Sequence, residues 1–266
     1  MPMPLNIDLT GKVVLITGVS SGIGFGTAHE FARAGACVAG CSRKAADDES
    51  VASFVQTVEG EGSCALYVQA DVTQKEDLEK LVQKVIETFG RLDMVVSSAG
   101  MNVFEGAEGC SEERWDYNLD LNLASHWRLA QLCKPYLEKS GEGVLLLMTS
   151  NHAFSSIPGC FPYNVTKTAI TGLVRSLAIE WGPEIRTVGV APGFIDTAGN
   201  DTWFDSFPDA MAERQRTIDL HPVKRIGTVQ EVGALCVFLA SPMARFISGT
   251  TILMDGGRSA LMQDSY

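Results

Sequence analysis

A buried strand, a glycine-rich turn and a helix follow one another near the start of the chain. Residues 12–17 read Lys-Val-Val-Leu-Ile-Thr, a β-branched run typical of a central parallel strand. The turn from Thr17 to Gly24 (T-G-V-S-S-G-I-G) follows directly, and a helix is expected from about 23 to 34. Glycines allow a tight turn and close approach to a pyrophosphate, and a helix N-terminus offers unpaired N–H groups. This unit therefore predicts a dinucleotide-binding start to an α/β fold.

Strands and helices alternate over the rest of the chain, with no linker and no internal repeat. Further strands are expected at 36–41, 65–70, 92–98, 143–150, 185–190 and 250–254. Helices are expected at 50–58, from 73 to 89, at 161–181 and at 229–240, with one or two more between 112 and 137. Such alternation predicts a parallel sheet covered on both faces, with right-handed crossovers. We expect one α/β domain over residues 1–266.

Composition excludes several classes of partner. The 266 residues are 45% hydrophobic, enough for one large core, and the net charge of −11 argues against nucleic acid and anionic membranes. No signal peptide and no run of about 18 apolar residues is visible, so no membrane span is expected. The seven cysteines are scattered without zinc-like spacing. We expect free thiols in a reducing cytoplasm and no metal site.

Tyr163 and Lys167 lie within the expected helix 161–181. Residues four apart stack on one side of a helix, so phenol and ammonium should be neighbours. A nearby cation favours the phenolate and lowers the pKa of a tyrosine, which could then act as a general acid or base near neutrality. The apolar face of this helix is expected to include Val165, Ala169, Leu173, Leu177 and Trp181, widened by Ile170 and Val174.

The ends of the strands indicate where a ligand would bind. Thr17, Ser98, Ser150 and Pro192 follow strands, and ligands of parallel sheets bind at the carboxyl ends of the strands. The second strand is followed by Ser42-Arg43-Lys44, where NAD sites usually carry an acidic residue. A hydroxyl and two cations suit a 2′-phosphate. We therefore expect NADP(H) to be preferred, with NAD(H) possible if Arg43 and Lys44 are only solvated charges.

The chain resembles the short-chain dehydrogenase/reductase family over nearly its whole length. The resemblance implies a Rossmann-type, doubly wound sheet of about seven strands with helices on both faces. It also implies an NAD(P)-dependent oxidoreductase that transfers a hydride between nicotinamide and a secondary alcohol or ketone. The motifs that carry it are Thr17-Gly18-x-x-x-Gly22-Ile23-Gly24, Asp71-Val72, Ala99-Gly100, Asn122, Ser150, Tyr163-x-x-x-Lys167, Pro192-Gly193 and Asp255-Gly256-Gly257.

The same resemblance implies the roles of four catalytic residues. Ser150 would hydrogen-bond the substrate oxygen, and Tyr163 would exchange a proton with that oxygen. Lys167 would lower the pKa of Tyr163 and bond the nicotinamide ribose, and Asn122 would hold a water in a proton relay. The cofactor-binding positions implied are Gly18, Ser20, Ser21, Gly22, Ile23, Gly24, Ser42, Arg43, Lys44, Asp71, Val72, Ser98, Ala99, Gly100, Tyr163, Lys167, Pro192, Gly193, Ile195 and Thr197.

The substrate side is less defined by sequence. The family's substrate loop matches about 196–224, where Trp203 could belong to a lid, and Asn151 and His152 directly follow Ser150. We expect these three residues to contact a small carbonyl or alcohol substrate. The family tends to form tetramers, so a homotetramer or homodimer is expected.

Some features depart from the family pattern and keep alternatives open. Ser97-Ser98 replaces the usual Asn-Asn, and Ser21 lacks the basic residue of some NADP-using members. The alternatives are an NAD-linked sugar or polyol dehydrogenase and a catalytically silent nucleotide-sensing protein. An enoyl reductase is disfavoured, because those relatives place six residues between Tyr and Lys, and that spacing from Tyr163 reaches Ile170.

Overall fold

Seven parallel strands form one sheet in the computed structural model, which describes residues 7–261. Their order is β3-β2-β1-β4-β5-β6-β7, with every neighbouring pair parallel. The order reverses beside β1, which confirms the predicted doubly wound fold. The strands are β1 Val13–Thr17, β2 Cys37–Ser42, β3 Ala65–Gln69, β4 Met94–Ser97, β5 Gly143–Met148, β6 Ile185–Pro192 and β7 Thr251–Met254.

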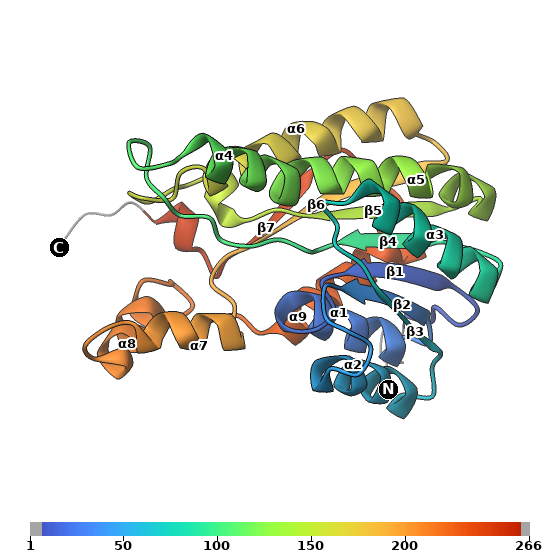
Figure 1. Cartoon of the computed structure of the whole chain (residues 1–266), viewed down its shortest axis with the longest axis horizontal. Helices are drawn as coiled ribbons and strands as arrows, with labels where there is room; N and C mark the ends of the chain where they lie inside the picture. Colours follow the sequence, from blue (N-terminus) through green and yellow to red (C-terminus); the bar gives the residue numbers. More distant parts are fainter. Residues whose placement is uncertain (1–6, 262–266) are drawn as a thin grey trace, which may run out of the picture.

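Helices cover both faces of this sheet (Figure 1). One face carries α1 Gly22–Arg33, α2 Glu49–Gly60 and α9 Val229–Ala240. The other carries α3 Lys75–Phe89, α5 Ser125–Ser140 and α6 Tyr163–Trp181, with α4 Glu112–Leu119 leading into α5. Two further helices, α7 Ala198–Asp205 and α8 Ala210–Asp219, stand away from the sheet at the lower left of Figure 1. The expected substrate loop is thus largely helical.

The core explains why the first strand shows no polar alternation. Val14 and Ile16 of β1 pack into the cluster beneath α1 and α9, whereas Val13 and Leu15 pack into the cluster beneath α3 and α5. All five residues of β1 are buried. A strand covered on both faces needs apolar side chains at every position, which is the pattern read in the sequence.

Helix α6 buries only part of the predicted apolar face, because Ile170, Val174 and Leu177 are buried as expected but two other predicted residues are not. Its buried residues are Tyr163, Thr166, Lys167, Ile170, Val174 and Leu177, whereas Val165 and Ala169 are exposed. Apolar residues occur on more than one side of this helix, so periodicity alone could not select the inner row. The polar side chains of the inner row have hydrogen-bond partners: Lys167 Nζ donates to Met148 O of β5 at 3.2 Å, and Thr166 Oγ1 donates to Tyr163 O at 2.8 Å.

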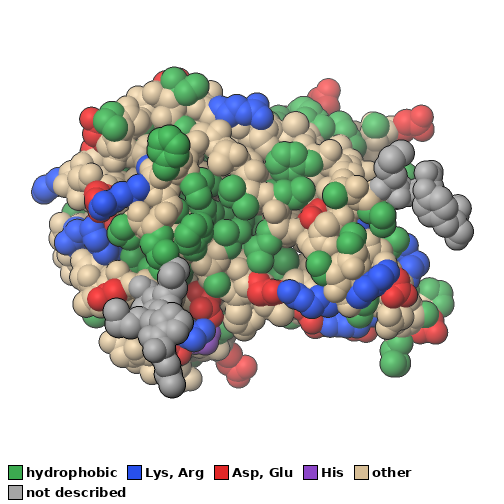
Figure 2. All heavy atoms as spheres, turned by 180° about the vertical axis from the view of Figure 1, so that it is seen from behind, with side chains coloured by type: hydrophobic (Ala, Val, Ile, Leu, Met, Phe, Trp, Pro, Cys, Tyr) green, Lys and Arg blue, Asp and Glu red, His purple; other side chains and the backbone are tan. Residues whose placement is uncertain are grey.

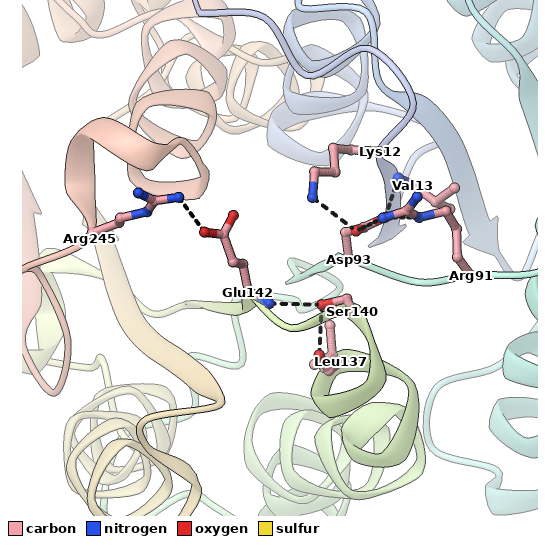
Figure 3. Close-up of polar contacts among 8 residues, drawn as sticks. All are labelled: Lys12, Val13, Arg91, Asp93, Leu137, Ser140, Glu142 and Arg245. Atoms are coloured by element: carbon pink, nitrogen blue, oxygen red, sulfur yellow. Dashed lines mark hydrogen bonds and ion pairs between the residues drawn. The ribbon is translucent and has the colours of Figure 1, made fainter.

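Ion pairs fasten the amino-terminal edge of the sheet. Asp93, just before β4, is only 2% exposed and accepts the Val13 N–H at 2.9 Å. The same carboxylate accepts two bonds from Arg91, at 2.8 and 2.6 Å, and lies 3.4 Å from Lys12 Nζ (Figure 3). The neighbouring ion pair of Arg245 and Glu142 is mostly exposed. Asp93 therefore joins the start of β1 to the start of β4.

We predict that Asp93→Ala lowers the free energy of unfolding by about 3 kcal/mol, because a buried N–H and a guanidinium lose their acceptor. Arg245→Ala removes an exposed pair and should change it by less than about 1 kcal/mol. Urea denaturation of both variants beside the wild type measures the difference. Equal losses in the two variants would contradict the assigned role of Asp93.

Candidate active site

The turn between β1 and α1 has a shape that only glycine permits. Gly18 and Gly22 have φ values of +80° and +58°, in the left-handed region. A Cβ on Gly24 would lie 2.2 Å from Gly18 O, which is impossible without moving the backbone. Ser21, the residue before α1, makes no side-chain cap, and the first turn of the helix carries no acid. The open N–H groups and the positive end of the helix suit an anion such as a pyrophosphate.

The carboxyl ends of neighbouring strands meet at this turn. Thr17 Oγ1 accepts the N–H groups of Ser98 and Ala99, both at 2.9 Å, which ties β1 to the residues after β4. Thr197, beyond β6, reaches the turn from another side, because a Cβ on Gly22 would lie 3.5 Å from its Cγ2. The structure thus brings together segments that the sequence places far apart.

Two further predicted positions lie at the end of β6. Gly193 follows β6 and packs on the residue after β7: a Cβ on Gly193 would lie 2.6 Å from Asp255 Cβ. Ile195 is 4% exposed, and its carbonyl accepts Asn200 Nδ2 at 2.6 Å. That bond fixes the path of the chain from β6 into α7.

Tyr163 and Lys167 are neighbours in the first turn of α6. Lys167 Nζ lies 5.4 Å from the centre of the Tyr163 ring. Lys167 is 4% exposed and Tyr163 is 8% exposed. Lys167 Nζ donates to Met148 O at 3.2 Å, at the end of β5. The ammonium is therefore held at the carboxyl edge of the sheet, beside the phenol.

Ser150 lies two residues beyond β5, and its hydroxyl is close enough to the Tyr163 phenol to act on the pKa of that phenol, which it lowers. Its hydroxyl donates to Asn151 Oδ1 at 3.2 Å and accepts the His152 N–H at 3.2 Å. Ser150 is 7% exposed. Serine, tyrosine and lysine thus form one group that spans the end of β5 and the start of α6.

Asn122 lies in a π-helical turn, Asp120–Ala124, that joins α4 to α5. Such turns often mark functional sites. Its side-chain amide makes three hydrogen bonds: Nδ2 donates to Met101 O at 2.9 Å and to Asn118 Oδ1 at 3.0 Å, and Oδ1 accepts the Met101 N–H at 3.1 Å, which leaves one lone pair of Oδ1. A Cβ on Gly100 would lie 2.8 Å from Asn122 Oδ1 and 3.5 Å from Lys167 Nζ. Asn122 and Lys167 therefore border the same glycine.

Burial dominates the electrostatics of this group. It lowers the pKa of Lys167 to about 7 and raises the pKa of Tyr163 above its ordinary value, although the Ser150 hydroxyl acts to lower it. The prediction that Tyr163 has a lowered pKa is therefore wrong for this structure. The sequence shows the spacing of the two residues but not the loss of solvent around both. In addition, a lysine that titrates near neutrality carries less positive charge and therefore lowers the pKa of a neighbouring tyrosine less.

His126 is a neighbour of this group that the sequence interpretation missed. It lies one helical turn beyond Asn122 and is fully buried, and within the described part of the chain neither ring nitrogen has a hydrogen-bond partner. Burial lowers the pKa of His126 well below its ordinary value, the charge of Lys167 acts in the same direction, and the Ser97 backbone opposes it. The imidazole is therefore neutral. Its i, i+4 spacing from Asn122 was the available signal.

Phe104, in the segment after β4, is a second residue that was missed. Its ring contacts Tyr163 edge-on, with centroids 5.5 Å apart, and contacts His152 in the same manner at 5.8 Å. The rings of His152 and Tyr163 are 6.1 Å apart. His152 thus lies at the site, as expected, whereas no sequence pattern connects Phe104 with either partner.

The residues expected to choose between NAD and NADP are not equally available. Ser42 Oγ lies 2.8 Å from Tyr67 Oη, and Lys44 Nζ forms an ion pair with Asp48 at 3.1 Å. Arg43 is exposed and forms no ion pair with any residue between 7 and 261. Arg43 is thus the more available cation at the end of β2.

Two other expected residues have local partners. Asp71 Oδ1 accepts the N–H and the hydroxyl of Thr73, at 2.9 and 2.8 Å, while Val72 is buried. Trp203 in α7 is 39% exposed and packs in an aromatic cluster with Phe194 and Phe207, at 5.6 and 4.8 Å between ring centres. Of the three expected substrate residues, Trp203 is the one that no contact in the described structure links to the Tyr163 group.

The buried ammonium predicts a pH-dependent stability. Lys167 has a folded pKa of about 7, below its ordinary value of 10.5, so between these pH values the unfolded chain binds more protons and wild-type stability rises with pH. We predict that Lys167→Met is more stable than the wild type by the widest margin below pH 7. The margin should shrink by about 3 kcal/mol between pH 7 and 9.

Urea unfolding at several pH values and one fixed protein concentration tests this. Other titrating groups cancel when the variant is compared with the wild type at each pH. A margin that stays constant over this range would show that Lys167 keeps its ordinary pKa in the folded protein.

The described residues include no helix long and apolar enough to cross a membrane. Within the same residues, no three His, Cys, Asp or Glu side chains are grouped so that they could hold a metal ion. The seven cysteines are all free, and four of them are buried.

Comparison with known proteins agrees with this architecture. A family model described as Enoyl-(Acyl carrier protein) reductase matches residues 18–259. The human Dehydrogenase/reductase SDR family member 4 is 36% identical over 253 residues, covering 94% of this chain and 88% of the relative. An oxidoreductase of Thermotoga maritima is 33% identical over 256 residues, 96% of this chain and 100% of the relative.

Solved structures are equally similar. The ligand-free aldohexose dehydrogenase of Thermoplasma acidophilum superposes with a TM-score of 0.88 at 27% identity, covering 98% of this chain and 99% of the other. A short-chain dehydrogenase/reductase of Serratia marcescens gives 0.86 at 28% identity, covering 94% and 99%. With the seven-stranded sheet and the Tyr163 group in place, these likenesses show that the chain is an oxidoreductase of the short-chain dehydrogenase/reductase family.

Proposed function

We propose that this enzyme uses NADP(H) in preference to NAD(H) and interconverts a ketone and a secondary alcohol, acting mainly as a reductase. The observation that carries the proposal is the contact group of Ser150, Tyr163 and Lys167 beside Gly100, at the same sheet edge as the glycine turn. A hydroxyl, a phenol and an ammonium in contact can bind and protonate a carbonyl oxygen.

The residues present fit a dinucleotide. The uncapped α1 terminus and the turn of Gly18, Gly22 and Gly24 would hold the pyrophosphate. A Cβ on Gly24 would collide with the backbone of Gly18, so only glycine fits there. Arg43 would pair with the 2′-phosphate, and Lys167 would reach the nicotinamide ribose. When bound, the nicotinamide supplies or takes up the hydride. The remaining expected contacts are those of Asp71, Val72, Ser98, Ala99, Pro192, Gly193, Ile195 and Thr197.

The protonation state of Tyr163 favours the reductive direction. Because burial raises the pKa of Tyr163, its phenol stays protonated at neutral pH. A protonated phenol can donate to the oxygen of a ketone as negative charge develops there. Ser150 Oγ, which lies beside the phenol, would donate a second hydrogen bond to the same oxygen and stabilise that charge.

Lys167 is suited to return the proton. A pKa of about 7 lets the ammonium release and regain a proton near neutrality. Its Nζ lies 5.4 Å from the centre of the Tyr163 ring and forms no hydrogen bond with the Tyr163 hydroxyl in the described structure, so the proton would pass through a water. Asn122, rigidly bonded and bordering the same glycine, would hold such a water. The neutral His126 adds no competing charge beside the ammonium.

The alternatives rest on specific likenesses. The similarity to an aldohexose dehydrogenase supports an NAD-linked sugar or polyol dehydrogenase as the second candidate. The description of the matching family model suggests an enoyl reductase, but the four-residue step from Tyr163 to Lys167 argues for carbonyl chemistry. A silent nucleotide sensor would have no use for a complete set of Asn122, Ser150, Tyr163 and Lys167.

Self-association is also proposed. Large apolar side chains are exposed on α5 and α6 and on β7, namely Trp127, Val165, Ile179 and Leu253. Figure 2 shows hydrophobic side chains gathered near the middle of the rear face of the molecule. Contiguous exposed apolar surface commonly marks a protein interface. A homotetramer or homodimer would cover these residues.

The decisive variant is Tyr163→Phe. Without the hydroxyl no proton reaches the substrate oxygen, and kcat/KM for ketone reduction should fall at least about 1000-fold. Binding of NADPH, measured by fluorescence titration, should change less than about threefold, which excludes a general folding defect. Near-normal turnover in Tyr163→Phe would remove the basis of the proposed mechanism.

Cofactor choice is tested at Arg43. Arg43→Ala should raise the KM for NADPH about 10- to 100-fold and leave the KM for NADH nearly unchanged, because only NADPH carries the phosphate that pairs with the guanidinium. Lys44→Ala is the matched control, since that ammonium already pairs with Asp48. If Arg43→Ala affects both cofactors alike, or the wild type prefers NADH, the assignment to NADP(H) is wrong.

A further inference from the structure

A large aromatic side chain stands exposed beside the Tyr163 phenol. Phe104 is 42% exposed, although its ring lies edge-on to Tyr163 with the centroids 5.5 Å apart and the planes at 66°. A phenylalanine is normally buried in a core of this size. An apolar ring left accessible in contact with the Tyr163 ring is a surface on which part of the substrate can pack.

The backbone holds Phe104 in this position. The N–H of Glu105 donates to Phe161 O at 2.8 Å, and the N–H of Tyr163 donates to Val103 O at 3.3 Å. Residues on both sides of Phe104 are thus bonded to the segment that begins α6. The ring is presented at the site by fixed chain geometry rather than by a mobile loop, so little entropy is lost when a substrate packs on it.

His152 forms the other part of this surface. Its ring meets Phe104 at 83° and Tyr163 at 79°, and its Nδ1 is buried with no partner in the described residues. Burial lowers the pKa of His152, the charge of Arg258 acts in the same direction, and the Ser155 backbone opposes both. The imidazole is therefore neutral at neutral pH. The surface formed by Phe104 and His152 is aromatic and uncharged.

We infer that the surface of Phe104 and His152 selects substrates with an aromatic ring directly attached to the reacting carbonyl. This inference rests on the proposed ketone reductase function. A ring attached to the carbonyl would lie against Phe104 when the carbonyl oxygen reaches Ser150 and Tyr163. Aromatic rings attract one another in edge-to-face and offset contacts, beyond the gain from apolar burial.

The same surface disfavours a polyhydroxy substrate. Each hydroxyl of a sugar that loses water needs a hydrogen-bond partner in the protein, and leaving one unpaired is costly. Phe104 offers none, His152 offers only its two ring nitrogens, and the Oγ of Ser150 is already committed to the reacting oxygen in the proposed mechanism. If the substrate were an aldohexose, we would therefore expect more hydrogen-bonding side chains at this position than the surface of Phe104 and His152 provides.

The experiment compares acetophenone with butan-2-one, two methyl ketones that differ in having a phenyl or an ethyl group. For the wild type with NADPH, kcat/KM for acetophenone should exceed that for butan-2-one at least about 30-fold. Phe104→Ala should lower this ratio at least about tenfold, because only acetophenone has a ring that packs on Phe104. Phe104→Leu, which keeps apolar bulk without a ring, should give an intermediate ratio.

Phe246→Ala is the matched control, because Phe246 is fully exposed and has no ring contact with the Tyr163 group. It should leave both substrates unchanged. Circular dichroism and NADPH titration show whether each variant is folded. If Phe104→Ala does not fold, the comparison of the two ketones is made with Phe104→Leu.

Two results would overturn the inference while the oxidoreductase proposal stands. One is an equal loss for both ketones in Phe104→Ala or a wild-type ratio near one. The other is oxidation of D-glucose with NADP⁺ at a higher kcat/KM than acetophenone reduction. Failure of the wild type to turn over any of these compounds, although NADPH binds, would instead count against the proposed function itself and the inference with it.

Discussion

The site depends on placing an ammonium inside the protein. Lys167 is 4% exposed, and its Nζ has one hydrogen-bond partner among residues 7–261, the Met148 carbonyl at 3.2 Å. Removal of an ammonium from water is costly, and the lowered pKa of Lys167 expresses that cost. The surrounding fold must supply the stability that keeps the side chain there. What is gained is a group that exchanges protons near neutrality and lies in contact with the Tyr163 ring.

The two edges of the sheet divide stability and function between them. At the amino edge, charges are paired: Asp93 joins the starts of β1 and β4 through Val13 and Arg91. At the carboxyl edge, the polar groups are left able to act. The α1 terminus has no side-chain cap, and Arg43 has no partner among the residues described. Parallel strands produce this asymmetry, since loops of all strands emerge at the same edge and can share one ligand.

Much of the fold follows from local signals. The expected strand at 36–41 forms at 37–42, and the expected helix at 229–240 forms over those residues. Apolar periodicity and glycines suffice there because each signal is local. Helix α6 shows the limit of these local signals. Its length is close to expectation, but its buried side includes Thr166 and Lys167 and not Val165 and Ala169. Contacts with β5, distant in sequence, decide which side is buried.

The site shows the same division between local and long-range information. Motif spacing brought Ser150, Tyr163 and Lys167 together correctly, because all three belong to β5, α6 and the short segment between them. The direction of the Tyr163 pKa could not be obtained in this way, since it depends on solvent excluded by several elements at once. Depth of burial is a property of the assembled fold.

Substrate specificity is the property that sequence motifs predict least well. Phe104 reaches Tyr163 only because the backbone of Glu105 bonds to Phe161, a pairing between two irregular segments with no periodic signal. Members of one family can therefore share the sheet, the glycine turn and the Tyr–Lys pair while presenting different side chains at this wall. An aldohexose dehydrogenase with the same fold and this chain can differ in substrate without differing in mechanism. The bonds between the segment after β4 and the start of α6 hold Phe104 in the place where the proposed surface needs it.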